Sequence, residues 1–179
     1  MIRNVAVYCA SANGVDPAYR SAAEELGREL AQRSIGIIYG GANVGLMQAV
    51  ASSSLALGGR VVGVIPEVLV DLEVAHRDLS ELHITSSMHT RKEMMAQLAD
   101  AFLVLPGGFG TLEELFEVLT WQVLKIHQKP IVLININGFY DKLLSFLDHC
   151  VEHGVLKQRN RELLIVVSGV DEVFAQLEI

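Results

Sequence analysis

Residues 101–114 have the sequence AFLVLPGGFGTLEE, in which five apolar residues lead directly into a glycine-rich turn and then into an amphipathic segment. The apolar run is typical of a buried strand, and the segment after the turn is typical of a helix. Glycines let backbone N–H groups approach a ligand closely, and the N–H groups at a helix start carry about half a positive charge. The junction therefore predicts an anion site, and the anion that we expect there is a phosphate.

Glu114 has two interpretations. It lies about one helical turn beyond the glycines, close enough to act on whatever group carries the bound phosphate. Alternatively, Thr111 and Glu114 have the spacing of a capping box, in which Thr111 caps the helix and Glu114 bonds back to the cap residue. The three glycines by themselves are equally typical of a tight turn. The rest of the chain has to distinguish these alternatives.

Strand and helix patterns alternate along the whole chain. We expect strands at residues 5–9, 36–39, 60–65, 82–85, 101–105, 130–134 and 165–167, helices at 16–33, 46–57, 88–98, 111–125, 141–152 and 170–177, and an irregular stretch or short helix within 66–80. Continuous apolar strands separated by helices specify a parallel sheet that is covered on both faces. We therefore predict one α/β domain over residues 1–179, with a Rossmann-like, doubly wound parallel sheet and helices on both faces.

Several candidate binding groups follow strands of this predicted sheet. Ser11, residues 40–45 and residues 107–110 all lie in small-residue turns directly after a strand. Ligands of such sheets bind beyond the carboxyl ends of the strands, so we expect these turns along one rim. Arg91 and Lys92 open a helix on the same rim and are candidate cations for the anion, with Arg91 also able to contact Glu114. The alternative for Lys92 is a solvated basic turn.

Composition and charge exclude several classes of protein. The chain of 179 residues has a formal net charge of −7 and no basic stripe, so we expect no nucleic-acid partner. No apolar run approaches the ~20 residues of a membrane span, and residues 1–4 show no leader pattern, so we expect a cytoplasmic protein without a membrane partner. The two cysteines form no C-x-x-C pair and are expected to be reduced. His149 and His153 share a helix face, but we expect no third ligand and no metal site.

Two motifs in order carry a specific resemblance. Met-His-x-Arg-Lys at residues 88–92, followed by Pro-Gly-Gly-x-Gly-Thr-x-x-Glu at residues 106–114, resembles the Lonely guy (LOG) family of cytokinin-activating phosphoribohydrolases. Residues 40–47, 119–130 and 138–141 extend the similarity over nearly the whole chain. The resemblance implies hydrolysis of the N-glycosidic bond of an adenosine 5′-monophosphate, typically with an isoprenoid group on N6, to a free base and ribose 5-phosphate. It also implies that no cofactor is needed, that AMP itself is often accepted, and that the protein forms a homodimer.

The resemblance also assigns roles to residues. By analogy, Arg91 and Glu114 are the catalytic pair, and the substrate-binding residues are Glu73, Lys92, Gly107, Gly108, Phe109, Gly110, Thr111, Leu112, Glu113 and Thr120. The chemistry agrees, because breaking a bond at the ribose anomeric carbon develops oxocarbenium character that a nearby carboxylate stabilises. The residue that protonates the leaving group stays unassigned.

Other functions remain as alternatives. A non-catalytic nucleotide or cofactor carrier, similar to molybdenum cofactor carrier proteins, would use the same glycine turns without a reaction. A lysine decarboxylase, an old label of some relatives, would need a Schiff-base lysine in a pocket for pyridoxal phosphate, and no lysine has that context. A dinucleotide-dependent oxidoreductase is disfavoured because residues 9–14 contain one glycine and no G-x-G-x-x-G. Trp121 is interpreted as core packing, a dimer contact or part of a pocket for the N6 group.

Overall fold

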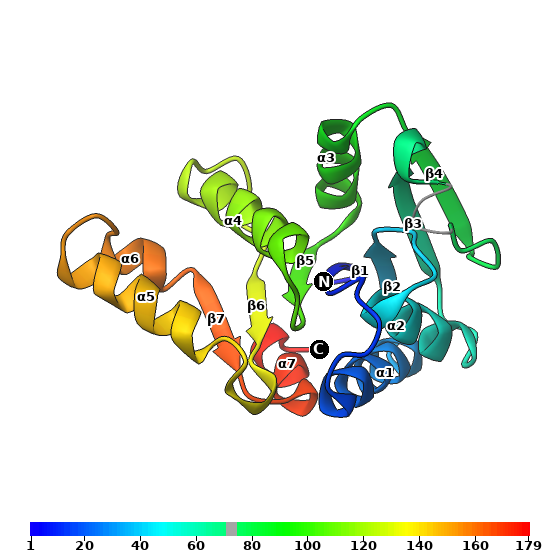
Figure 1. Ribbon diagram of the computed structural model, residues 1–179, viewed down its shortest axis with the longest axis horizontal. Coiled ribbons are helices and arrows are strands. Elements are labelled where there is room, and N and C mark those ends of the chain that lie inside the picture. Colours follow the sequence, from blue (N-terminus) through cyan, green and yellow to red (C-terminus); the bar gives the residue numbers. More distant parts are fainter. Residues whose placement is uncertain (71–74) are drawn as a thin grey trace.

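The computed structural model describes residues 1–70 and 75–179. Its centre is a seven-stranded sheet in the order β4-β3-β2-β1-β5-β6-β7, and every neighbouring pair of strands is parallel (Figure 1). The strands are β1 (Asn4–Tyr8), β2 (Gly36–Tyr39), β3 (Val61–Pro66), β4 (Glu81–Thr85), β5 (Ala101–Val104), β6 (Ile131–Ile134) and β7 (Leu164–Val167). The predicted doubly wound parallel sheet is confirmed.

The strand order places a switch point at the middle of the sheet. From β1 the chain adds β2, β3 and β4 on one side, and it then returns to add β5, β6 and β7 on the other side. The turns that leave β1 and β5 therefore diverge and open a crevice at their carboxyl ends, which is where ligands bind in sheets of this kind. The glycine-rich turn of residues 105–108 directly follows β5, so the topology alone directs it to this crevice.

Helices cover both faces of the sheet, as Figure 1 shows. One face packs against α1 (Pro17–Gln32), α2 (Gly45–Leu55) and α7 (Val170–Leu177), and the other against α3 (Met88–Leu98), α4 (Phe109–Val123) and α5 (Asp141–Glu152). Side chains of β1 alternate between the two cores, with Val5 and Val7 in the first and Ala6 and Tyr8 in the second. The central strands are buried on both sides, which explains why their sequences are continuous apolar runs.

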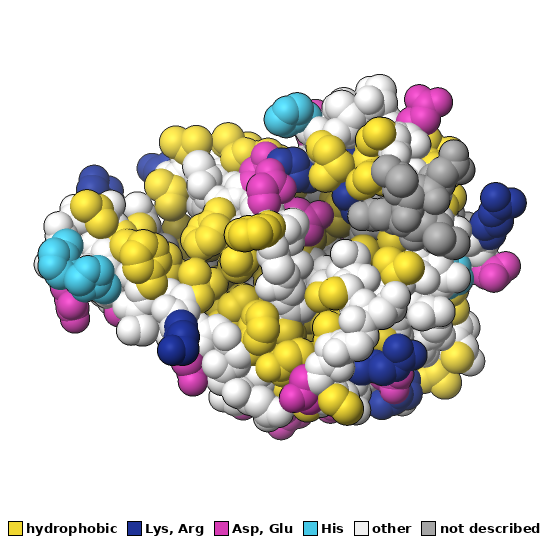
Figure 2. Space-filling view, viewed as in Figure 1, with side chains coloured by type: hydrophobic (Ala, Val, Ile, Leu, Met, Phe, Trp, Pro, Cys, Tyr) yellow, Lys and Arg dark blue, Asp and Glu magenta, His cyan; other side chains and the backbone are white. Residues whose placement is uncertain are grey.

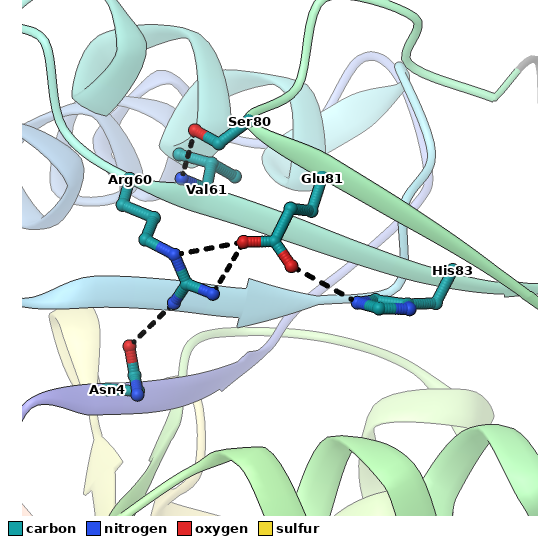
Figure 3. Close-up of polar contacts among 6 residues, drawn as sticks. All are labelled: Asn4, Arg60, Val61, Ser80, Glu81 and His83. Carbon is teal, nitrogen blue, oxygen red and sulfur yellow. Dashed lines mark hydrogen bonds and ion pairs between the residues drawn. The ribbon is translucent and has the colours of Figure 1, made fainter.

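A polar cluster ties the edge of the sheet together at the opposite end from the crevice. Arg60 donates hydrogen bonds to Glu81 at 2.7 and 3.2 Å and to Asn4 at 3.0 Å, and Glu81 lies 3.5 Å from His83 (Figure 3). The hydrogen bond and charge of Arg60 lower the pKa of the Glu81 carboxyl. These groups are largely exposed, so the cluster fixes the register of the edge strand β4 more than it adds stability.

The local structure differs from expectation at two helices. Helix α4 begins at Phe109 with Gly108 as its N-cap, two residues before the predicted start, so Thr111 lies inside the first turn and the capping box of Thr111 with Glu114 is wrong. A capping box does occur at the start of α3, between Ser87 and Thr90. A four-residue helix, α6 (Gln158–Arg161), was not expected, and short 3₁₀ turns follow β3 (Glu67–Leu69) and β6 (Ile136–Gly138). Over the described residues, no helix combines the length and apolar character that a membrane crossing requires.

Candidate active site

A cavity of about 230 Å³ lies at the carboxyl ends of β1, β2 and β5. Its walls come from the turn after β1, the end of β2, and the starts of α2, α3 and α4. The lining residues are Val7, Cys9, Ala10, Ser11, Ala12, Gly40, Met47, Met88, Arg91, Gly108, Phe109, Gly110, Thr111, Glu113 and Glu114. Ser11, Gly40 and residues 108–110 thus line one cavity, whereas Gly107 and residues 41–45 of the turns expected there are not among the lining residues.

The start of α4 forms one wall of this cavity. Gly108 caps the helix without a side-chain hydrogen bond, and the first bond of the helix ladder at this end runs from the Leu112 N–H to the Gly108 carbonyl at 3.0 Å. The N–H groups of residues 109–111 precede that bond and have no partner within the helix ladder. Gly107 is required here because a Cβ would collide with the Thr111 side chain. This wall has the polarity and the open backbone of an anion site.

Arg91 lies against the carboxyl ends of β2 and β3. Its side chain is buried, and its guanidinium donates from Nε to the Val64 carbonyl at 3.0 Å and from Nη2 to the Gly40 carbonyl at 3.1 Å. A Cβ at Gly40 would collide with Nη2, so this glycine makes room for the guanidinium. Nη1 lies 3.7 Å from the Met88 sulfur. Two backbone carbonyls therefore fix the orientation of a cation in the cavity wall.

Glu114 lies in the second turn of α4 and lines the same cavity. Its side chain is half-buried. Burial and the neighbouring Glu114 carboxylate together raise the pKa of the Cys9 thiol, and the same two causes raise the pKa of the Tyr8 phenol well above its usual range. Both groups lie at the carboxyl end of β1, so the negative charge of Glu114 acts on the pKa values of groups at the switch point. The structure brings the two predicted catalytic residues to one cavity.

Lys92 does not line the cavity, although it follows Arg91 directly. Its ammonium forms ion pairs with Glu113 and, at 3.1 Å, with Glu117, both on α4. Burial disfavours the charged form, but the hydrogen bonds to these two carboxylates outweigh it and raise the pKa of Lys92. The structure therefore shows Lys92 bridging α3 and α4, with its charge already balanced. Its role in substrate binding stays a prediction.

The other predicted binding residues fall in three places. Gly108, Phe109, Gly110, Thr111 and Glu113 line the cavity, Gly107 supports Thr111, and Leu112 packs against the core. Thr120 is exposed, and its hydroxyl donates a hydrogen bond to the Phe116 carbonyl at 2.7 Å. It lies in a second hollow, nine residues or about 13.5 Å along α4 from Thr111. Glu73 lies outside the described residues. Trp121 is half-buried, contacts the core from the outer face of α4, and lines a third hollow with His89, Glu93 and His127.

Several lining residues were not predicted from the sequence. Val7, Cys9, Ala10, Ala12, Met47 and Met88 give the cavity an apolar side opposite the polar start of α4. Their types carry no chemical signal, because the same residues are typical of any core. Their positions did carry one, since each lies at the end of β1, in the loop directly after it, or in the first turn of a helix that follows a strand. An apolar wall facing an anion site suits an aromatic base that is attached to a phosphorylated sugar.

The chain is similar to known proteins over nearly its whole length. The model of a protein family described as possible lysine decarboxylase matches residues 47–177. The cytokinin riboside 5′-monophosphate phosphoribohydrolase LOG of Oryza sativa subsp. japonica is 46% identical over 176 residues, covering 98% of this chain and 73% of the rice protein. The cytokinin riboside 5′-monophosphate phosphoribohydrolase of Rhodococcoides fascians is 44% identical, covering 98% of this chain and 89% of its own length.

Solved structures share the fold at low sequence identity. The molybdenum cofactor binding protein of Rippkaea orientalis superposes with a TM-score of 0.75 at 18% identity, covering 98% of this chain and 94% of that one. A molybdenum cofactor carrier protein of Chlamydomonas reinhardtii gives a TM-score of 0.73 at 19% identity, covering 98% of this chain and 95% of that one. At these identities the likeness extends to the fold alone.

Proposed function

Because this chain belongs to the Lonely guy (LOG) family of cytokinin riboside 5′-monophosphate phosphoribohydrolases, we propose that it hydrolyses the N-glycosidic bond of adenosine 5′-monophosphates, with or without a group on N6. The products are the free base and ribose 5-phosphate. The observation that carries this proposal is the meeting of Arg91, Glu114 and the start of α4 in one cavity. That arrangement has an anion site, a fixed cation and a carboxylate within the reach of one nucleotide.

The 5′-phosphate, the most strongly charged group of the substrate, determines how the substrate is oriented in the cavity. The 5′-phosphate binds at the N–H groups of residues 109–111, where the α4 dipole adds about half a positive charge. The base then lies against the apolar wall that includes Met47 and Met88. The ribose spans the distance between them, and its anomeric carbon comes to lie beside Glu114. Arg91, held by two carbonyls, faces the same space.

The chemistry follows from this placement. As the bond from C1′ to the base breaks, positive charge develops on the sugar ring, and the Glu114 carboxylate stabilises it. Glu114 also accepts a hydrogen bond from the attacking water, whose oxygen forms the new bond to C1′. The water thus supplies a hydroxyl group to the ribose and a proton to the departing base. In this scheme Glu114 both stabilises the developing positive charge and activates the water, and no metal or cofactor is needed for either step.

The family description of possible lysine decarboxylase does not fit these residues. A decarboxylase that uses pyridoxal phosphate needs a lysine in its pocket for the Schiff base. No lysine occurs among the described residues that line the cavity. Lys92 is held by Glu113 and Glu117, and Lys129 donates to the Ala96 carbonyl at 2.6 Å. These two lysines are therefore engaged elsewhere.

A product assay tests the proposal. The purified chain is incubated with isopentenyladenosine 5′-monophosphate and with AMP, and the free base and ribose 5-phosphate are measured together. The matching nucleosides serve as controls, because the α4 site predicts that removing the phosphate abolishes most of the turnover. Nucleotide binding without release of base would support the alternative of a carrier. Equal turnover of nucleoside and nucleotide would contradict the phosphate site.

We also propose that the protein is a homodimer, with a second copy covering the hollow along α4, α5 and α6. This hollow, of about 230 Å³, is lined mainly by apolar side chains: Phe116, Leu119, Val123, Leu124, Leu147, Leu156 and Leu164. Figure 2 shows hydrophobic side chains gathered over α4 and between α4 and α5, an exposure that is typical of an association surface. Thr120 lies in this hollow, so a substrate contact by Thr120 would be made in the cavity of the partner copy.

The state of the two cysteines supports a proposal for the cellular compartment of the protein. Cys9 is buried and Cys150 half-buried, and both are free. Free thiols suit a reducing compartment, and we therefore propose that the protein acts in the cytoplasm.

A further inference from the structure

Three potential metal ligands lie together at the end of α5. His149, Glu152 and His153 occupy positions i, i+3 and i+4, which places them on one exposed helix face. One ligand atom from each lies within 4.8 Å of the others. Figure 2 shows histidine side chains beside acidic ones at this end of the molecule. The expectation that His149 and His153 have no third ligand nearby is wrong, because the helical spacing brings the Glu152 carboxylate to the pair.

The hydrogen bonding of His153 prepares it as a ligand. Its Nδ1 lies 3.0 Å from the carbonyl oxygen of His149. A carbonyl oxygen only accepts, so Nδ1 carries the proton and Nε2 keeps its lone pair. Histidines that bind metals commonly have their second nitrogen bonded to a carbonyl in this way, which fixes the tautomer and the ring. The same contact holds the His153 ring 4.0 Å from the ring of His149, measured between centroids.

The electrostatic setting also favours a cation. The cluster lies in the last turn of α5, where the helix dipole contributes about half a negative charge. Glu152 adds a full negative charge 3.9 Å from Nδ1 of His149. The chain as a whole has a net charge of −7, so the long-range field attracts a cation as well.

We propose that His149, Glu152 and His153 bind a divalent transition-metal cation of the Zn²⁺ class. Two imidazoles and a carboxylate match the donors that Zn²⁺, Ni²⁺ and Cu²⁺ prefer, whereas Mg²⁺ and Ca²⁺ prefer oxygen ligands throughout. The H-x-x-E-H spacing on a helix also occurs in a class of zinc enzymes. Water completes the coordination, because the cluster is open to solvent.

The geometry needs only a small adjustment. Ligands at about 2.0–2.1 Å from a tetrahedral zinc lie roughly 3.3 Å from one another, and one candidate ligand atom of each residue already lies within 4.8 Å of the others. The side chains of His149 and Glu152 are 59% and 73% exposed, and rotation about their side-chain bonds meets little packing. The backbone of α5 already sets the spacing.

The protein contains a matched control for this cluster. His83 lies 3.5 Å from Glu81, and both side chains are partly exposed. This pair has the same two residue types, but Glu81 is held by Arg60 and the pair has no second histidine among the described residues. A His83→Asn variant therefore removes a histidine next to a glutamate without touching the proposed site.

Zinc titration of the tag-free chain by calorimetry tests the proposal. We expect one Zn²⁺ per chain, an affinity about 100-fold weaker in the double variant His149→Asn with His153→Asn, about tenfold weaker in Glu152→Gln, and unchanged in His83→Asn. Titration with Co²⁺ adds a visible spectrum that reports the coordination geometry. Wild-type affinity in the double variant would overturn the site, and wild-type affinity in Glu152→Gln would overturn its three-ligand form. Since all three side chains are exposed, these variants keep the fold, and circular dichroism checks this.

Discussion

The substitution Gly40→Ala tests whether the orientation of Arg91 matters for the reaction. Gly40 directly follows β2, and its carbonyl accepts a hydrogen bond from Nη2 of Arg91 at 3.1 Å. A Cβ built at this position overlaps Nη2, and it also touches the sulfur of Met47 at 3.0 Å. Because the guanidinium is confined between the Gly40 and Val64 carbonyls, it has to move away from both. Arg91 itself remains in the chain, so only its position changes.

The size of the effect follows from the contacts that are lost. Displacing a group at the reacting centre by about 1 Å costs about 100-fold in rate, which is about 2.7 kcal/mol of transition-state stabilisation. Losing a hydrogen bond between the buried guanidinium and a carbonyl costs about 1.5–3 kcal/mol of stability. For a chain of this length, that loss lowers the melting temperature by about 3–12 °C. The variant should therefore be folded at 25 °C and nearly inactive.

A second glycine separates the loss of activity from the loss of stability. A Cβ at Gly59 would collide with Ser54 and crowd Ala31, in the packing of α2 and α1 and away from the cavity. Gly59→Ala should cost about 1–3 kcal/mol of stability through overpacking and leave kcat/KM within about twofold of wild type. Base release and thermal unfolding are measured for both variants. A folded Gly40→Ala protein with kcat/KM within about threefold of wild type would refute the role of a fixed Arg91.

Four further predictions concern other parts of the chain. Glu114→Gln should reduce base release at least 100-fold while nucleotide affinity, measured by calorimetry, stays within about tenfold; normal turnover would reverse the assignment. Tyr140→Phe removes the hydroxyl that donates to the buried Leu105 carbonyl at 2.8 Å, before the glycine turn, and should cost about 1–3 kcal/mol in a denaturant titration, whereas an unchanged midpoint would contradict this contact. Partial burial of the Asp100 carboxyl raises its pKa, but hydrogen bonds from two backbone N–H groups outweigh burial and lower it. Its stabilising effect is therefore full above about pH 4 and is lost as the pH falls through the folded pKa; in Asp100→Asn the acid loss of stability should be smaller. Leu124→Glu in the apolar hollow should convert the proposed dimer to a monomer, as measured by light scattering, whereas Val155→Glu, which is 79% exposed and outside the hollow, should not.

The fold could be predicted because its signals are local and repeated. Each central buried strand is a continuous apolar run that ends in a turn, and helices follow most of these runs, which together specify a parallel sheet. The capping-box spacing of Thr111 predicts a start of α4 that is two residues late, because Gly108 and not Thr111 takes the cap position. The helix Gln158–Arg161 has four residues and therefore no periodic pattern to detect.

The division of work between Arg91 and Lys92 could not be predicted. The sequence placed both cations on one rim, but neighbouring residues on a helix differ in direction by about 100°. Arg91 consequently faces the carbonyls of β2 and β3, while Lys92 faces the α4 carboxylates of Glu113 and Glu117. Both carboxylates are separated from Lys92 by more than 20 residues, so the pairing depends on how α3 and α4 pack. Long-range packing of this kind leaves no mark in a single sequence.

This pairing determines the charge of the cavity. Lys92 is paired with Glu113 and Glu117 and does not line the cavity, so the cationic groups among the described lining residues are Arg91 and the start of α4, about +1.5 charges together. A bound phosphate monoester carries about −1.5 to −2 charges at neutral pH and offsets them. The Glu114 carboxylate lines the same cavity and contributes a negative charge to it. In the proposed reaction, an oxocarbenium-like transition state places its positive charge next to this carboxylate, whereas the ground-state sugar is neutral there. The site therefore favours the transition state over the bound substrate, which is the condition for raising the rate and not merely the affinity.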